Sequence, residues 1–125
     1  MPVVSPGLRL LRDARALVSE GWCRGADARS SDGEAVDPWD ERAVAWSLLG
    51  AIVAVLEREA NEWGEMPLEE LASALYAIAD VVDVDSLAAW NDAPGRTQAE
   101  VAGVLAAAEA SFEPPWPDEA QFRMN

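Results

Sequence analysis

Apolar residues recur three and four positions apart along most of the chain, which is the spacing of one face of an α-helix. The first such run begins after Ser5-Pro6, a capping residue followed by proline, and ends at Gly21. The second run begins with the same signal at Asp37-Pro38 and extends to Trp63, before a glycine. Both segments are therefore predicted to be helices.

Two more helical runs follow in the second half of the chain. One spans residues 67–82, and the other begins at the capping box Thr97-x-x-Glu100. Between them, Ser86 is expected to cap a short helical turn that ends at Trp90. The pattern predicts four main helices plus a short helical turn.

The remaining segments lack helical periodicity. Residues 24–36 are rich in Gly, Asp, Ser and Arg and predict a flexible surface loop. Pro114-Pro115-Trp116-Pro117 cannot be helical and favours an extended conformation. No segment alternates with period two for long enough to predict a strand. We therefore expect an all-α fold, with a single-domain bundle at residues 1–113 and a tail at 114–125.

Two helices differ in their polar faces. The second is apolar nearly all round before Glu57, which is typical of a helix at the centre of a bundle. The first carries Arg9, Arg12 and Arg15 opposite its apolar stripe. Because cations near a helix N-terminus oppose the helix dipole, we expect these arginines to face carboxylates of the same chain or of a second copy.

Composition excludes many kinds of chemistry. The 125 residues include no histidine, and all nine bases are arginines. These absences exclude Ser-His-Asp and Cys-His nucleophiles, histidine metal sites, catalytic lysines and P-loops. No cofactor is expected. The single cysteine, Cys23, cannot form an internal disulfide, and we interpret it as a small, half-buried residue.

The net charge of −14 is unevenly distributed. Residues 1–30 hold five arginines and three acids, whereas residues 31–125 hold four arginines and twenty acids. An acidic body repels nucleic acid and attracts basic partners. The longest uncharged run, residues 43–56, is shorter than a membrane span. We expect a cytoplasmic protein that binds neither membranes nor nucleic acid.

Three stretches resemble a family of small bacterial and phage-associated proteins known only as a domain of unknown function. They are Gly21-Trp22, residues 42–52 and residues 89–101. The family often has cysteines in the central stretch, where this chain has Ala45 and Ser47, which are substitutes of similar volume for small buried residues. The resemblance implies a shared fold and supplies no catalytic residues.

The most distinctive local cluster lies before the last helix. It consists of Trp90, Asn91, Asp92, Arg96 and Thr97. One hypothesis is a recognition site in which the arginine binds a carboxylate or phosphate at a helix N-terminus. The alternative is structural: the polar residues cap and turn the chain, the arginine pairs with a nearby aspartate, and the tryptophan fills the core.

Carboxylates gather where the second predicted helix meets the third. Glu59, Glu62, Glu69 and Glu70 could hold Mg²⁺ for a nucleotide phosphohydrolase, because this cation prefers oxygen ligands. The pairing of Glu59-x-x-Glu62 with an aspartate pair at positions 80 and 83 resembles the motif of all-α pyrophosphatases. However, the third helix would separate the two pairs by about 20 Å. A solvated acidic face is the alternative.

Six tryptophans are many for this length. Trp39 and Trp46 are seven positions apart and would share one helix face, either in the core or as a protein-binding patch. Our main hypothesis is a non-enzymatic module that binds a protein with a basic surface. The alternatives are the Mg²⁺-dependent phosphohydrolase and a DNA mimic that inhibits a nucleic-acid-binding protein. A homodimer is compatible with the sequence.

Overall fold

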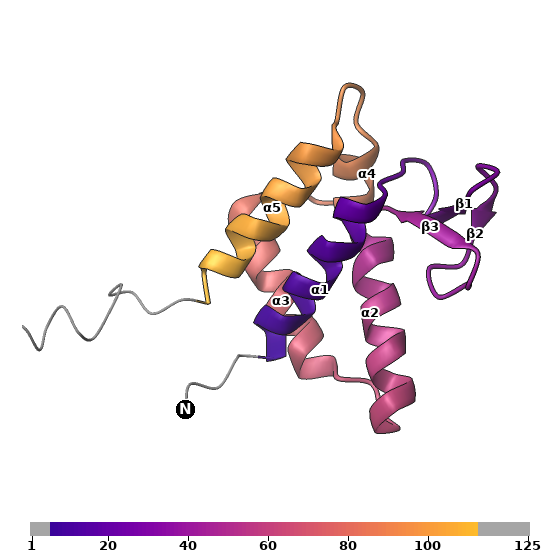
Figure 1. Cartoon of the computed structure of the whole chain (residues 1–125). Coiled ribbons are helices and arrows are strands. Elements are labelled where there is room, and N and C mark those ends of the chain that lie inside the picture. The colour runs from indigo at the N-terminus through magenta and orange to yellow at the C-terminus, as the bar shows by residue number, and fades with distance from the viewer. Residues whose placement is uncertain (1–5, 113–125) are drawn as a thin grey trace, which may run out of the picture.

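The computed structural model describes residues 6–112, which form a helical layer and a small sheet beside it (Figure 1). The sheet lies at one end of the helices and is joined to them through β3 and the segment that follows α1. The elements are α1 Pro6–Glu20, β1 Ala28–Ser30, β2 Ala35–Val36, β3 Ala43–Trp46, α2 Leu48–Trp63, α3 Leu68–Val81, α4 Leu87–Asp92 and α5 Gln98–Ala110.

The sheet shows that the all-α prediction is wrong, because the fold is mixed α/β. Residues 24–36, predicted to be a flexible loop, contain β1 and β2, and residues 43–46 form a strand instead of the start of a long helix. The strands are only two to four residues long, too short for a period-two pattern to be visible. The helix signal at Asp37-Pro38 opens a turn, in which Asp40 N donates to Asp37 O (3.0 Å).

The three strands are antiparallel, in the order β2-β1-β3. Ala28, at the centre, is paired with Val36 on one side and with Trp46 on the other. A tight turn joins β1 to β2, where Ser30 N donates to Glu34 O (2.9 Å) and Gly33 adopts a left-handed conformation. The sheet is therefore a short hairpin of β1 and β2 with β3 added on the other side of β1.

Helix α1, and not α2, lies at the centre of the fold. It packs against α2, α3, α5 and β3 (Figure 1). Leu10, Leu11, Ala14 and Val18 are fully buried on it. The apolar α2 instead lies on one side of α1, with Leu48, Ile52 and Val55 buried. The amphipathic first helix is thus surrounded, and its polar stripe occupies the one face that remains open.

The arginine stripe on α1 meets a carboxylate of the same chain, as one of the two sequence expectations proposed. Arg15 forms a two-pronged ion pair with Glu109 on α5, and Nη2 to Oε1 is 2.9 Å. Arg12 lies 4.0 Å from the same carboxylate. Glu109 is buried, and its ion pair with Arg15 links α1 to α5, the last helix of the described residues.

The predicted helix caps after residue 80 are confirmed, and a different cap begins α2. Ser86 accepts from Ala89 N at the start of α4, and Thr97 with Glu100 forms the capping box of α5. Helix α2 begins later than predicted, with Ser47 accepting from Gly50 N (2.9 Å). A serine cap therefore outcompetes the aspartate-proline signal ten residues upstream.

Backbone packs directly on backbone at two places, where α2 meets the residue before β1 and where the segment after α1 meets β3. A Cβ on Gly50 would lie 1.8 Å from Asp27 O, and one on Gly21 would lie 2.1 Å from Val44 O. Both positions therefore require glycine in this arrangement. Within residues 6–112, no helix is long and apolar enough to cross a membrane. The predicted tail at 114–125, with its Pro-Pro-Trp-Pro stretch, lies outside the described residues.

Candidate interaction surface

One buried amide fastens the sheet to the helical layer. Asn91 is 1% exposed, and its Oδ1 accepts from the indole Nε1 of Trp22 (2.8 Å) and from the backbone N of Leu48 (3.0 Å). Its Nδ2 donates to Cys23 O (3.1 Å) and to Asp92 Oδ1 (3.0 Å). This side chain thus connects α4, the first residue of α2 and the segment after α1.

The neighbouring residues extend this attachment. Asp92 accepts from Gly25 N (3.0 Å), and Arg24 donates to Ala93 O (3.1 Å). The backbone hydrogen bond from Gly25, followed by that from the Asn91 amide, lowers the pKa of the Asp92 carboxyl. Burial raises the pKa of the Cys23 thiol, which keeps it in the unreactive protonated form. Residues 23–25 are therefore held against α4.

Arg96 and Thr97 follow α4 in the chain, where Arg96 contacts α4 and Thr97 begins α5. The Arg96 guanidinium stacks 3.9 Å from the centre of the Trp90 ring and donates through Nε to Trp90 O (2.8 Å). It also pairs with Glu100 (3.3 Å), not with the aspartates considered from the sequence. Thr97 caps α5.

The structure thus brings the five residues of the predicted binding cluster together, and each is engaged within the chain. These contacts are structural in kind, although Arg96 pairs with Glu100 and not with an aspartate, and Trp90 is only partly buried. Ligand binding by the cluster stays a prediction, because none of these contacts tests it.

The carboxylates of the metal hypothesis are not gathered at one point. Glu59, on α2, is 7% exposed, and burial raises its pKa, opposed by the nearby charge of Arg9. Glu62 and Glu69 are exposed, and Glu70 is partly buried. Within residues 6–112, no three histidine, cysteine, aspartate or glutamate side chains are placed to hold a metal ion. The metal site remains untested and receives no support from this geometry.

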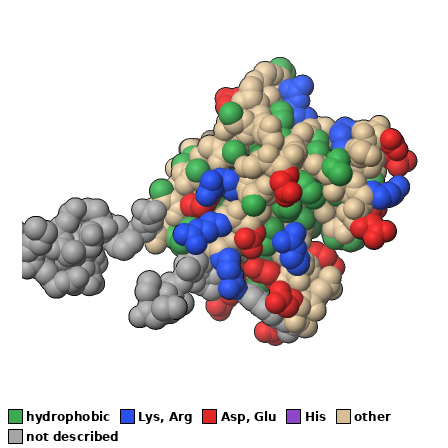
Figure 2. All heavy atoms as spheres, viewed as in Figure 1, with side chains coloured by type: hydrophobic (Ala, Val, Ile, Leu, Met, Phe, Trp, Pro, Cys, Tyr) green, Lys and Arg blue, Asp and Glu red, His purple; other side chains and the backbone are tan. Residues whose placement is uncertain are grey.

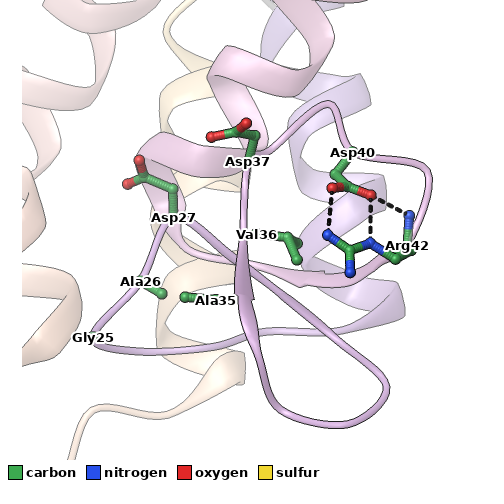
Figure 3. Close-up of a pocket in the computed structure, with 8 residues that line it drawn as sticks. All are labelled: Gly25, Ala26, Asp27, Ala35, Val36, Asp37, Asp40 and Arg42. Carbon is green, nitrogen blue, oxygen red and sulfur yellow. Dashed lines mark hydrogen bonds and ion pairs between the residues drawn. The ribbon is translucent and has the colours of Figure 1, made fainter.

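An open hollow of about 450 Å³ lies where the segments leading into β1 and out of β2 separate (Figure 3). We call it the acidic hollow; it is lined by Gly25, Ala26, Asp27, Ala35, Val36, Asp37, Asp40 and Arg42. Figure 3 shows Asp27 and Asp37 at one rim and the pair of Asp40 with Arg42 at the other. Alanines form part of its wall, so the carboxylates are the chemically distinctive groups.

Only some of these charges are neutralised. Arg42 donates to both oxygens of Asp40, with Nη2 to Oδ2 at 3.0 Å, and this bonding lowers the pKa of the Asp40 carboxyl. Arg42 also reaches Glu34 (3.4 Å). The side chains of Asp27 and Asp37 form no hydrogen bond or ion pair with the described part of the chain. They present unpaired negative charge to solvent.

A second hollow, of about 410 Å³, lies on the other side of the segment 37–42. We call it the aromatic groove. Its apolar wall consists of Leu17, Pro38, Trp39, Ala43, Trp46 and Ala54, and its polar rim of Asp40, Glu41, Glu57, Arg58 and Asn61. Trp46 is partly buried and donates to Pro38 O (3.0 Å), which fixes its ring, whereas Trp39 is 55% exposed. The prediction that the two tryptophans share a helix face is wrong, because neither lies in a helix, but both line this groove.

Neither hollow was predicted from the sequence, because residues 37–47 were expected to be helical. The signal available was the mixture of aromatic and acidic residues in Asp37-Pro38-Trp39-Asp40-Glu41, which is unusual in the first turn of a buried helix. In the structure these residues form a turn between two hollows, in which Asp37, Trp39 and Glu41 are exposed and Pro38 is buried. Charge and an aromatic side chain therefore meet at the surface.

The profile of a family of unknown function, DUF6197, matches residues 4–111. The chain belongs to this family. The resemblance noted in the sequence is thereby confirmed, and the DUF6197 match includes Asn91, the acidic hollow and the aromatic groove. No curated protein and no solved structure matches the chain. The DUF6197 description names no activity, so the functional argument rests on the surface itself.

Proposed function

We propose that the protein is a non-enzymatic interaction module that binds a partner protein with a basic surface through the face of its small sheet. The observation that carries this proposal is that Asp27 and Asp37, whose carboxylates form no ion pair with the described residues, line one hollow, while the exposed Trp39, two positions after Asp37, lines the next. Carboxylates attract and orient a basic partner, and a tryptophan supplies a large contact area.

The attachment of the sheet favours such a role. Asn91, Gly50 and Asp92 hold residues 23–48 to the helices through hydrogen bonds and backbone packing. A surface that is already ordered loses less conformational entropy when a partner binds. Figure 2 shows several basic side chains over the middle of the face, where Figure 1 places α1, and basic and acidic side chains side by side at the sheet end.

The test is an NMR titration of the ¹⁵N-labelled full chain with an oligo-arginine peptide. We expect saturable shifts concentrated in residues 25–46 that weaken as salt is added, because surface electrostatics are screened. An oligo-glutamate peptide is the matched control and should produce no shifts there. Shifts spread evenly over all acidic regions, or confined to the junction of α2 and α3, would overturn the proposal.

A further inference from the structure

Resting on the proposed function, we infer that the aromatic groove seats an arginine side chain of the partner, stacked on Trp39 and paired with the carboxylates at the rim. The groove has the two components that bind a guanidinium. It offers the exposed face of an indole and the carboxylates of Asp40, Glu41 and Glu57.

The charge of the groove selects a cation. Three carboxylates line it against one arginine, Arg58, and Asp40 is already paired with Arg42 outside the groove. Glu41 and Glu57 form no ion pair within the described residues, so two carboxylates remain for an incoming positive group. Arg58 opposes that group. Its removal should therefore strengthen binding.

The same chain contains the arrangement that we infer for the complex. Arg96 stacks on Trp90 at 3.9 Å while its guanidinium pairs with Glu100 at 3.3 Å. Arg24 lies over Trp22 at 6.0 Å. Among the described residues no arginine stacks on Trp39, so its exposed ring is available.

Arginine fits this groove better than lysine does. Its flat guanidinium stacks on an aromatic ring and can donate sideways to carboxylates at the same time, whereas an ammonium is a compact and strongly hydrated charge. The groove places a flat ring, Trp39, beside Glu41 and Glu57, which matches both modes. The partner segment is therefore one that carries an exposed arginine.

The test uses a displayed library of random peptides, selected on the immobilised full chain, followed by affinity measurement on synthetic copies. Selected peptides should contain arginine, and replacing that arginine with neutral citrulline or with lysine should weaken binding. Trp39→Ala should lower the affinity about tenfold or more. Tyr76→Ala is the matched control, because Tyr76 is 75% exposed on α3, away from the groove, and its loss should change nothing.

Two further variants keep the test decisive if Trp39→Ala is poorly folded. Glu57→Gln should weaken binding, and Arg58→Gln should strengthen it; on α2, Glu57 is partly buried and Arg58 is exposed. The inference is overturned if no peptide is selected, or if selected peptides bind these variants or citrulline copies unchanged. It is also overturned if peptides bind only after residues 113–125 are deleted, because the tail would then be the occupant. Dissociation of a dimer by Trp39→Ala would overturn it as well, because a second copy would then be the occupant.

The two proposals fail separately. If oligo-arginine shifts residues 25–46 while Trp39 and citrulline substitutions have no effect, the acidic face binds basic partners without an arginine seat in the groove. If the oligo-arginine shifts lie elsewhere, the proposed function itself fails.

Discussion

Among the candidate residues named from the sequence, Asn91 forms the most side-chain hydrogen bonds within the described structure. Its amide oxygen accepts from the indole of Trp22 and from the first backbone N–H of α2, and its amide nitrogen donates to the carbonyl of Cys23. From the sequence, asparagine before Asp-Ala-Pro-Gly indicated a turn, but Asn91 lies in α4 and the turn follows at residues 93–95. Its distant partners lie 43 to 69 positions away, beyond the reach of any local pattern.

Replacing Asn91 with alanine should destabilise the protein by about 2–4 kcal/mol, because it leaves several buried polar groups without partners. The measurement is the free energy of unfolding in urea. Asn61→Ala is the matched control: Asn61 is exposed on α2, and its loss should cost about 0.5 kcal/mol or less. Equal costs at both positions would contradict the connecting role.

Glu59 predicts an unusual dependence of stability on pH. Burial raises its folded-state pKa above the ordinary value of 4.5, so the folded protein holds this proton more tightly than the unfolded chain does. Its favourable contribution is complete below pH 4.5 and is lost as the pH rises through the raised value. Glu59→Gln, which mimics the protonated form, should therefore raise the melting temperature at pH 7 and leave it unchanged near pH 4.

Thermal unfolding of Glu59→Gln at the two pH values checks this prediction. Glu65→Gln is the control for replacing a carboxylate with an amide, because Glu65 is exposed between α2 and α3. A lower melting temperature for Glu59→Gln at pH 7 would show that the ionised carboxylate stabilises the fold, contrary to the burial argument.

Among the elements, helices were predictable where a cap and a long apolar run coincide. The caps at Ser86 and Thr97 and the stop at Gly21 follow from local chemistry that the sequence displays. The sheet was not predictable in this way. Its strands are short, and β3 is continuous in sequence with α2, so the apolar run 43–56 belongs partly to each.

The contact between α1 and α5 yields an asymmetric prediction. Arg15→Met should destabilise the protein by about 1–3 kcal/mol, because it deprives the buried Glu109 of its main partner. Arg12→Met is the matched control, with a looser contact at 4.0 Å, and should cost about 1 kcal/mol or less. Urea unfolding of both variants measures the difference. A larger loss for Arg12→Met would place the main ion pair elsewhere.

For the whole molecule, composition predicted an acidic partner surface but not its position. Asp27 and Asp37 are separated by ten positions in a segment expected to be loop and helix, and the sheet brings them to one rim. The hollows are products of a tertiary fold that no local pattern specified. Membership of a family of unknown function was expected from the sequence, and the match over residues 4–111 shows it.

The net charge of −14 also affects stability as a whole. Mutual repulsion among surface carboxylates opposes the compact state, and salt screens that repulsion. Raising sodium chloride from low to moderate concentration should therefore increase the melting temperature by a few degrees, measured by circular dichroism. A fall in melting temperature would mean that attractive surface pairs outweigh the repulsion.

The central position of α1 has a consequence for biosynthesis. The ribosome makes this helix before the other described elements and makes α5 after them, yet α1 packs on both α5 and α3. A nascent chain that ends before residue 98 leaves the apolar stripe of α1 without one of its neighbours. Since domains generally fold as units, we expect native packing only after synthesis has passed α5, with the early segment exposed to chaperones until then.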